Sequence, residues 1–273
     1  MKKLLVFTDL DGSLLDHHNY HWNKALPAIG LLQQHGFPLI FNSSKTAVEI
    51  DTLKKQMNNY DPFICENGAV VNIPANYFSS TVPRHDIHHG YEAHLFARPY
   101  EQVLSILNEL RDKYGFKFKG FHDMSVDALI AETQLSKEQS LAAKQRQASE
   151  PLVWLDSEAA MDKFKLLLKI KGLSVTSGGR FFHVMTEVNK GEAVLWLLQQ
   201  YKKFEPRTQW LSVGLGDSFN DVAMLEVVDY PVLISNPAGK QPELSHLNQL
   251  KRPELPGTAG WNQSILDLVN MIT

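Results

Sequence analysis

The sequence predicts an α/β protein in which a doubly wound parallel sheet carries a smaller inserted α+β domain. Short apolar runs at residues 4–8 and 37–42 have the length and composition of strands that are buried on both faces. Helical patterns separate these runs, and the same alternation returns after residue 189. Strands that alternate with helices favour a parallel sheet with right-handed crossovers. Residues 84–186 differ, since they are richer in polar and aromatic residues and have antiparallel character.

The first part of the chain carries local signals for its expected elements. These elements are a strand at 4–8, a helix at 24–35, a strand at 37–42, a helix at 46–59, and a strand, turn and strand at 62–73. Pro27 weakens the first helix, whereas Thr46 and Glu49 are spaced as a capping box for the second. Asn67-Gly68 lies between two apolar runs, which is a strong signal for a hairpin.

The middle and late parts of the chain are expected to form the inserted domain and the rest of the sheet. The middle elements are helices at 99–115, 136–149 and 157–172 and strands at 116–121, 150–156 and 179–186. The late elements are a helix at 189–204, a strand at 208–217, a helix at 221–228 and a strand at 230–235. We therefore predict a core made of residues 1–83 and 187–273, with residues 84–186 as an inserted cap or substrate domain.

Composition and charge exclude several classes of protein. The 273 residues are 44% hydrophobic, which is ample for a large core, and the formal net charge is -3. Without a basic excess we expect no nucleic-acid partner, and without a long apolar run we expect no membrane span. The first apolar run stops in Asp-Leu-Asp, too early for a signal peptide. Cys65 is the only cysteine, so no intrachain disulfide can form, which fits a cytoplasmic protein.

Polar residues follow the carboxyl ends of the expected core strands, where open parallel sheets bind their ligands. They are Asp9, Asp11 and Ser13 after the first strand, Ser43, Ser44 and Lys45 after the second, Lys190 in the first turn of the late helix, and Asp217, Asn220 and Asp221 after the next strand. The sequence therefore predicts that carboxylates, hydroxyls and two lysines meet at one edge of the sheet.

Carboxylates gathered in one site repel one another unless some are protonated or a cation is present. Oxygen ligands without histidine or cysteine favour Mg2+. The hydroxyl and ammonium groups would hold an anion, and phosphate suits both sets of groups. Either Asp9 or Asp11 could attack phosphorus while the other moves protons, because Gly12 allows a turn that brings the two acids together.

Each motif also has a structural explanation when it is taken alone. Asp9 and Asp11 could form a solvated turn, Ser43 and Ser44 a helix cap, and Lys190 a surface residue. The "GDSFND" stretch could be a plain loop or a calcium-type turn. Their joint order after successive core strands favours an active site.

Four stretches resemble the motifs of the haloacid dehalogenase-like (HAD) phosphatases, namely "DLDGSLL", "NSSKT", Lys190 and "GDSFND". The resemblance implies a Rossmann-like core with a type 2 cap, as in the Cof-like enzymes. Within this group the chain is closer to the mannosyl-3-phosphoglycerate phosphatase family, which is similar in "NSSKT", "PFICENGAVV" and "SGGRFFHV". Ser13 replaces the commoner threonine of the first motif and keeps its hydroxyl.

The resemblance implies a role for each matching residue. Asp9 would be the nucleophile that forms an aspartyl-phosphate, and Asp11 the general acid and base. Ser43 and Lys190 would hold the transferring phosphoryl group. The implied Mg2+ ligands are Asp9, the backbone carbonyl of Asp11 and Asp217, with Asn220 and Asp221 completing or orienting the metal shell.

The substrate implied by the resemblance is a sugar-linked phosphoglycerate, which would be converted to mannosylglycerate and phosphate. The substrate-binding candidates are Ser44, Lys45, Asn67, Gly68, Gly178, Gly179 and Arg180. Arg180 can grip a carboxylate with two hydrogen bonds, and the glycines before it let the backbone approach a ligand. A tight turn with a solvated arginine is the alternative, as a simple hairpin turn is for Asn67 and Gly68.

Other functions remain open on the sequence alone. They are a phosphatase for trehalose or sucrose phosphate, a sugar phosphomutase, and a non-catalytic sensor of phosphorylated sugars. Histidines at 85, 88, 89 and 94 suggest zinc, but their spacing fits no helical pair, and we interpret residues 84–94 as a polar linker. The sequence does not determine the oligomeric state.

Overall fold

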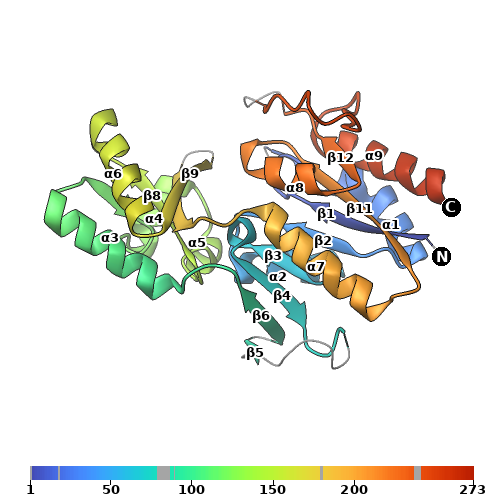
Figure 1. Cartoon of the computed structure of the whole chain (residues 1–273), viewed down its shortest axis with the longest axis horizontal. Coiled ribbons are helices and arrows are strands. Elements are labelled where there is room, and N and C mark those ends of the chain that lie inside the picture. The colour runs from blue at the N-terminus through green and yellow to red at the C-terminus, as the bar shows by residue number, and fades with distance from the viewer. Residues whose placement is uncertain (1, 18, 79–86, 89, 179–180, 237–240) are drawn as a thin grey trace.

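The computed structural model describes residues 2–17, 19–78, 87–88, 90–178, 181–236 and 241–273. Within them the strands form two separate sheets. Figure 1 shows the larger sheet and its helices beside a smaller unit, which we call the cap unit (residues 98–186). Among the described residues, no helix combines the length and the apolar character that a membrane crossing requires.

The larger sheet has eight strands in the order β12-β11-β1-β2-β3-β4-β6-β5. Their bounds are β1 Lys2–Thr8, β2 Leu39–Asn42, β3 Phe63–Cys65, β4 Val70–Pro74, β5 Ile87–His88, β6 Tyr91–Leu95, β11 Gln209–Gly216 and β12 Tyr230–Leu233. The first five in spatial order pair in parallel, whereas β4, β6 and β5 continue the sheet antiparallel. The predicted α/β class with a doubly wound parallel sheet is confirmed.

Helices cover both faces of this sheet because successive strand residues point to opposite sides. In β1, Leu4 and Val6 pack against one set of helices, and Leu5 and Phe7 pack against the other. The first set is α1 (Leu26–His35), α2 (Ala47–Gln56) and α9 (Gly257–Ile272), and the second is α7 (Lys190–Phe204) and α8 (Val222–Val227). All four β1 side chains are fully buried, as an apolar run within three layers requires.

The cap unit contains a four-stranded antiparallel sheet in the order β7-β8-β10-β9. The strands are β7 Phe118–Gly120, β8 Ser149–Trp154, β9 Leu173–Gly178 and β10 Phe181–Thr186. Helices α3 (Tyr100–Tyr114) and α6 (Glu158–Ile170) form an apolar core with one face of the sheet. The shorter helices α4 (Val126–Thr133) and α5 (Lys137–Ala143) belong to a second cluster, which includes side chains of β8 and β10.

Several local predictions are confirmed. Thr46 accepts a hydrogen bond from the Glu49 amide at 3.2 Å, and the Glu49 carboxylate accepts one from the Thr46 amide at 2.9 Å, so the capping box forms. The turn at residues 66–68 joins β3 and β4 as an antiparallel hairpin, with a short 3-10 turn, η2 (Glu66–Gly68), at its tip. Both signals lie within a few residues, which is why sequence alone reveals them.

The predicted start of the inserted segment, residue 84, comes before the point at which the chain leaves the larger sheet. Residues 84–186 were expected to form the insertion, but β6 (Tyr91–Leu95) pairs with β4 and β5 pairs with β6 in the larger sheet. Residue 84 itself lies outside the described residues. The polar composition around residue 90 indicated a linker, whereas cross-strand pairing with β4 makes this segment part of the larger sheet.

The helix expected at 136–149 is wrong in its second half. Helix α5 ends at Ala143, and Ser149 already belongs to β8. The segment between them turns because its backbone binds groups from the larger sheet unit, as described below. Helix α1 also differs, since a 3-10 turn, η1 (Asn23–Ala25), precedes it and Pro27 lies in its first turn, where no amide donor is needed. Strands β5, β6 and β9 and helices α4 and α9 were not predicted.

Candidate active site

The candidate site lies at the carboxyl end of β1, which is flanked by β2 on one side and β11 on the other. Strand order reverses here, so the crevice beside β1 is the expected ligand position in such a sheet. Asp9 directly follows β1, and the chain then turns at Gly12, which has a φ of 84°. A Cβ atom at Gly12 would lie 2.8 Å from Oδ2 of Asp217, so glycine allows these two loops to approach closely.

Lys190 links two acids of the site. It is the first residue of α7, whose N-cap Asn189 accepts hydrogen bonds from the amides of Gly191 and Glu192. Its ammonium nitrogen Nζ lies 2.6 Å from Oδ1 of Asp9 and 2.6 Å from Oδ1 of Asp221. The Lys190 side chain is fully buried, so both ion pairs are shielded from water.

Burial and charge shift the pKa values of this cluster. Burial raises the pKa of Asp9 well above its ordinary value, and although Lys190 opposes this shift, the neighbouring acids add to it. Burial disfavours the Lys190 ammonium, but Asp221 and Asp9 together raise its pKa. Burial and the charge of Asp221 raise the pKa of Asp217 to about 6. The single ammonium of Lys190 does not balance the charge of the three clustered acids, so the site favours a bound cation.

Asp217 is held by three polar side chains. Ser13 donates to its Oδ1 at 3.2 Å, Asn236 donates to its Oδ2 at 2.6 Å, and Gln241 donates to its backbone oxygen at 3.3 Å. Our reading of the sequence missed Asn236 and Gln241. Asn236 could have been found by the rule that identified the others, because it follows the carboxyl end of β12.

The donor set suits a hard divalent cation. Oxygens of Asp9, Asp217 and Asp221 all lie within 4.8 Å of one another. Oδ2 of Asp221 accepts hydrogen bonds from the amides of Asp217 and Ser218 at 3.0 and 3.1 Å, and its Oδ1 accepts from Lys190. Asp221 therefore serves mainly to orient its neighbours, whereas Asp9 and Asp217 keep oxygen lone pairs for a metal such as Mg2+.

Asp11 lies at the outer side of this cluster. Its Oδ2 lies 2.8 Å from the ammonium of Lys45, and the side chain is about one third exposed, with 38% of its area accessible. Its Oδ1 is a buried oxygen with no hydrogen-bond partner among the described residues. Burial disfavours the Lys45 ammonium, but the carboxylates of Asp11 and Glu49 raise its pKa. Asp11 thus has one oxygen paired with a cation and one buried oxygen without a hydrogen-bond partner among the described residues.

Ser43 follows β2 and is almost fully buried. Its amide donates to the backbone oxygen of Ile64, and its hydroxyl oxygen accepts a hydrogen bond from the Lys45 amide at 3.3 Å. The Ser43 backbone oxygen accepts from the Asn67 amide at 3.0 Å, so the β2 loop and the hairpin tip support each other. Ser43 and Lys45 thus lie in one ordered loop beside Asp11.

The other predicted substrate-binding residues have varied positions. The backbone oxygen of Ser44 accepts a hydrogen bond from Arg146 at 3.2 Å, and Oδ1 of Asn67 accepts one from Asn220 at 3.0 Å. Gly68 packs so closely on the start of α7 that a Cβ atom would lie 2.3 Å from the backbone oxygen of Asn189. Gly178 ends β9, whereas Gly179 and Arg180 lie outside the described residues. Contact of these six residues with a substrate stays a prediction.

The two described histidines of the 84–94 segment, His88 in β5 and His94 in β6, lie on the larger sheet rather than at this site. His94 is in β6 and stacks on Trp196 of α7 with ring centroids 4.3 Å apart. His85 and His89 lie outside the described residues. Within the described part of the chain, the acidic group of Asp9, Asp217 and Asp221 is the cluster with metal-ligand spacing.

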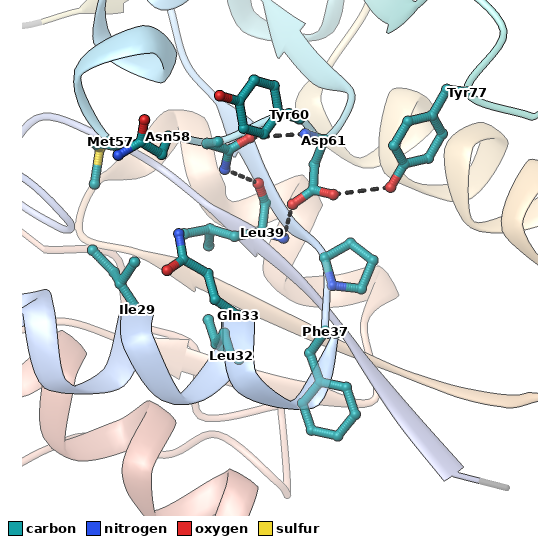
Figure 2. A pocket seen from close by; sticks show the side chains of 13 residues that line it. Ile29, Leu32, Gln33, Phe37, Leu39, Met57, Asn58, Tyr60, Asp61 and Tyr77 are labelled. Carbon is teal, nitrogen blue, oxygen red and sulfur yellow. Dashed lines mark hydrogen bonds between the residues drawn. The ribbon is translucent and has the colours of Figure 1, made fainter.

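A separate cavity of about 260 Å³ lies at the opposite end of the sheet. It is lined by the end of α1, the start of β2 and the loop between α2 and β3, and Figure 2 shows Asp61 bonded to Tyr77 and to the Leu39 amide at its wall. None of the described site residues lines it. It is therefore distinct from the catalytic edge.

Comparison with known proteins agrees with this site. The family of haloacid dehalogenase-like hydrolases matches residues 6–241. The chain belongs to this family, and we identify it as a phosphoric monoester hydrolase. A Thermoplasma acidophilum protein of known structure has the same fold, with a TM-score of 0.68 and 17% identity, over 98% of this chain and 99% of that protein.

Two relatives are much closer in sequence. A glucosyl-3-phosphoglycerate/mannosyl-3-phosphoglycerate phosphatase from Methanococcoides burtonii is 36% identical over 98% of this chain and 97% of its own length. A phosphatase of the same name from Persephonella marina is 35% identical over 98% of each chain. The resemblance suggested by the sequence motifs is confirmed.

Proposed function

We propose that this chain removes phosphate from mannosyl-3-phosphoglycerate, and from its glucosyl counterpart, by a Mg2+-dependent reaction with an aspartyl-phosphate intermediate. One observation carries the mechanism: Lys190 lies buried between Asp9 and Asp221, and Asp217 belongs to the same acidic cluster. The choice of substrate rests on the two relatives, which are named as phosphatases of these two compounds.

In the first half-reaction Asp9 attacks phosphorus. A bond forms between a carboxylate oxygen of Asp9 and phosphorus while the bond from phosphorus to the glycerate oxygen breaks. Lys190 holds Oδ1 of Asp9 at 2.6 Å, which leaves Oδ2 for the attack. Asp11, protonated at this stage, gives its proton to the departing glycerate oxygen.

In the second half-reaction water replaces the sugar-linked glycerate. Asp11 now lacks its proton and takes one from the attacking water. The water oxygen bonds to phosphorus, the bond from phosphorus to Asp9 breaks, and free phosphate leaves. Both side chains return to their starting states, so the cycle needs no further reactant.

The metal site would be made by Asp9, Asp217 and the carbonyl of Asp11. A bound Mg2+ would neutralise the acids and draw electron density from the phosphoryl oxygens. Asp221 and Asn220 would orient this set, because Asp221 binds the amides of the Asp217 loop. Ser43 and Lys190 would donate to the phosphoryl oxygens.

The remainder of the substrate would lie between this edge and the cap unit. The glycerate carboxylate of the substrate needs a cationic partner. Lys45 and Arg180 are the cationic residues that the sequence offers for this role. Lys45 already lies 2.8 Å from Asp11, which protonates the departing glycerate oxygen in this mechanism. We expect Ser44, Asn67, Gly68, Gly178 and Gly179 to shape the rest of this region.

The proposal is tested by phosphate release from a panel of esters with Mg2+ or with a chelator. Mannosyl- and glucosyl-3-phosphoglycerate should be turned over best, and the chelator should abolish release. Faster turnover of sucrose or trehalose phosphate would overturn the substrate assignment, and an isomeric phosphate as product would indicate a mutase instead.

Replacing the nucleophile tests the mechanism. Asp9→Asn should lower kcat by about a thousandfold or more, because the amide cannot form the phosphoenzyme. Asp267→Asn is the matched control, since Asp267 is exposed on α9. Phosphate release that persists in Asp9→Asn at the control's rate would refute the assignment of the nucleophile.

A further inference from the structure

The tip of the β3–β4 hairpin has a strained backbone. Glu66, Asn67 and Gly68 have φ angles of 51°, 58° and 99°, so three successive residues adopt left-handed conformations. Such a conformation is unfavourable for a residue that has a side chain, and Glu is poorly suited to it. The surrounding structure must therefore stabilise the tip, and its contacts suggest a function.

The tip contacts two loops of the active site. The Glu66 amide donates to the backbone oxygen of Lys45 at 3.0 Å, and the Asn67 amide donates to that of Ser43 at 3.0 Å. The Asn67 side chain accepts a hydrogen bond from Asn220 at 3.0 Å. The tip therefore holds the β2 loop and the loop after β11 in a fixed relation.

The side chain of Glu66 leaves the larger sheet unit and enters the cap unit. Its Oε1 accepts a hydrogen bond from the amide of Gln147 at 2.7 Å. Its Oε2 accepts from the amides of Ala148 and Ser149 at 3.1 and 2.8 Å and from the Ser149 hydroxyl at 2.6 Å. The carboxylate is fully buried, so these four donors replace its water.

Arg146 supplies the opposite charge and a second link between the units. Its Nε lies 3.5 Å from Oε2 of Glu66, and its Nη2 donates to the Ser149 hydroxyl at 2.6 Å. The same Nη2 donates to the backbone oxygen of Ser44, which adjoins the phosphate-binding candidate Ser43. Glu66, Arg146 and Ser149 form what we call the core–cap cluster.

We propose that Glu66 is a positioning residue that sets the cap unit against the phosphate-binding loop and thereby determines which leaving groups are hydrolysed. This inference rests on the proposed function, in which the cap unit holds the sugar-linked glycerate. Hydrolysis of a substrate whose large leaving group binds the cap unit depends on the distance between the cap unit and the phosphate-binding loop. Hydrolysis of a small aryl phosphate, which needs only the acids and the loop at the end of β1 and β2, does not. The charge of Glu66 matters because both oxygens of a carboxylate accept and together bind four donors, whereas a glutamine amide would set its NH2 against at least one of them.

The test compares two substrates in matched variants. Glu66→Gln keeps the size of the side chain but not its charge. Glu150→Gln is the control, because Glu150 is also buried but bonds within the cap unit, to Tyr100 at 2.5 Å and to the His122 amide at 2.8 Å. The milder variant Ser149→Ala removes one of the four donors and serves if Glu66→Gln does not fold.

The readout is the ratio of kcat/KM for mannosyl-3-phosphoglycerate to that for p-nitrophenyl phosphate. In Glu66→Gln this ratio should fall by about tenfold or more, since small displacements of bound groups cost that much. In Ser149→Ala it should fall less, and in Glu150→Gln it should stay at the wild-type value. An equal loss for both substrates, or no loss for either, would overturn the inference.

A second readout is independent of the assigned substrate. Hydrogen exchange of the amides at residues 147–149 should speed up in Glu66→Gln but not in Glu150→Gln, because only the first loses their acceptor. Unchanged protection would overturn the inference. If wild-type protein hydrolyses another ester better than mannosyl-3-phosphoglycerate, the proposed substrate has failed, and the ratio is then measured with that ester.

Discussion

Lys190 gives the most direct test of the electrostatics of the site. We consider Lys190→Met, which keeps the length and much of the volume of the side chain but removes its charge. The ammonium lies 2.6 Å from a carboxylate oxygen of Asp9 and 2.6 Å from one of Asp221, and all three residues are buried. The substitution therefore leaves two buried carboxylates without their common partner.

The expected cost follows from this burial. Removing one partner of a buried ion pair lowers the free energy of unfolding by about 3–5 kcal/mol, because the remaining charge is uncompensated. For a chain of this size, each kcal/mol lowers the melting temperature by about 2–4 °C, so we expect a drop of about 10 °C. Activity should fall by at least about a hundredfold, because the group also stabilises phosphoryl charge.

Thermal unfolding followed by circular dichroism at pH 7 in a chelator measures this cost. The control is Lys171→Met, because Lys171 pairs with Glu109 at 2.7 Å on the surface, and it should leave the melting temperature unchanged. The double variant Asp9→Asn/Lys190→Met should lose less stability than the sum of its single variants, because it removes both charges of one pair. A Lys190→Met protein that melts within about 2 °C of wild type would refute the reasoning.

Two further predictions concern the metal site. Without metal, burial and the charge of Asp221 raise the pKa of Asp217 from 3.8 to about 6. The folded state therefore binds this proton more tightly than the unfolded chain does. The stability that this proton contributes is lost as pH rises through about 6. Mg2+ competes with that proton, so the rise in melting temperature that Mg2+ produces should grow between pH 5 and 7, and a pH-independent rise would contradict this. Asn236→Ala removes the 2.6 Å hydrogen bond to Asp217 and should weaken Mg2+ binding about 10- to 100-fold by calorimetry, with little change in kcat at saturating Mg2+. Equal Mg2+ affinity in the variant and wild type would show that Asn236 does not position this ligand.

The sequence was most informative where the signal is local or follows from strand order. The capping box of Thr46 and Glu49 involves atoms within three residues, so the residue types alone indicate it. Asp9, Ser43 and Asp217 follow successive parallel strands, and parallel strands bring their carboxyl ends to one edge. Those two rules were enough to predict the catalytic edge before any distance was known.

Other features depend on partners that lie far away in the chain. Residues 144–148 looked helical, but the amides of residues 147–149 bind Glu66, about eighty positions earlier. Residues 84–94 looked like a linker, but β6 (Tyr91–Leu95) pairs with β4, and β5 (Ile87–His88) pairs with β6 at the edge of the larger sheet. The helix propensities of ordinary residues differ by only tenths of a kcal/mol, whereas a hydrogen bond to a charged group contributes about 1.5–3 kcal/mol. Long-range hydrogen bonds of this kind therefore override local propensity.

The sequence by itself determined the class of fold, the family and the acids that meet at the candidate site, because each depends on residue type and on the order of elements. The tertiary structure alone decided how charge is distributed among those acids. It placed the buried ammonium of Lys190 between Asp9 and Asp221, left one oxygen of Asp11 without a partner among the described residues, and directed Glu66 into the cap unit. These outcomes depend on distances of a few ångströms between residues far apart in the chain, and burial makes each of them strong.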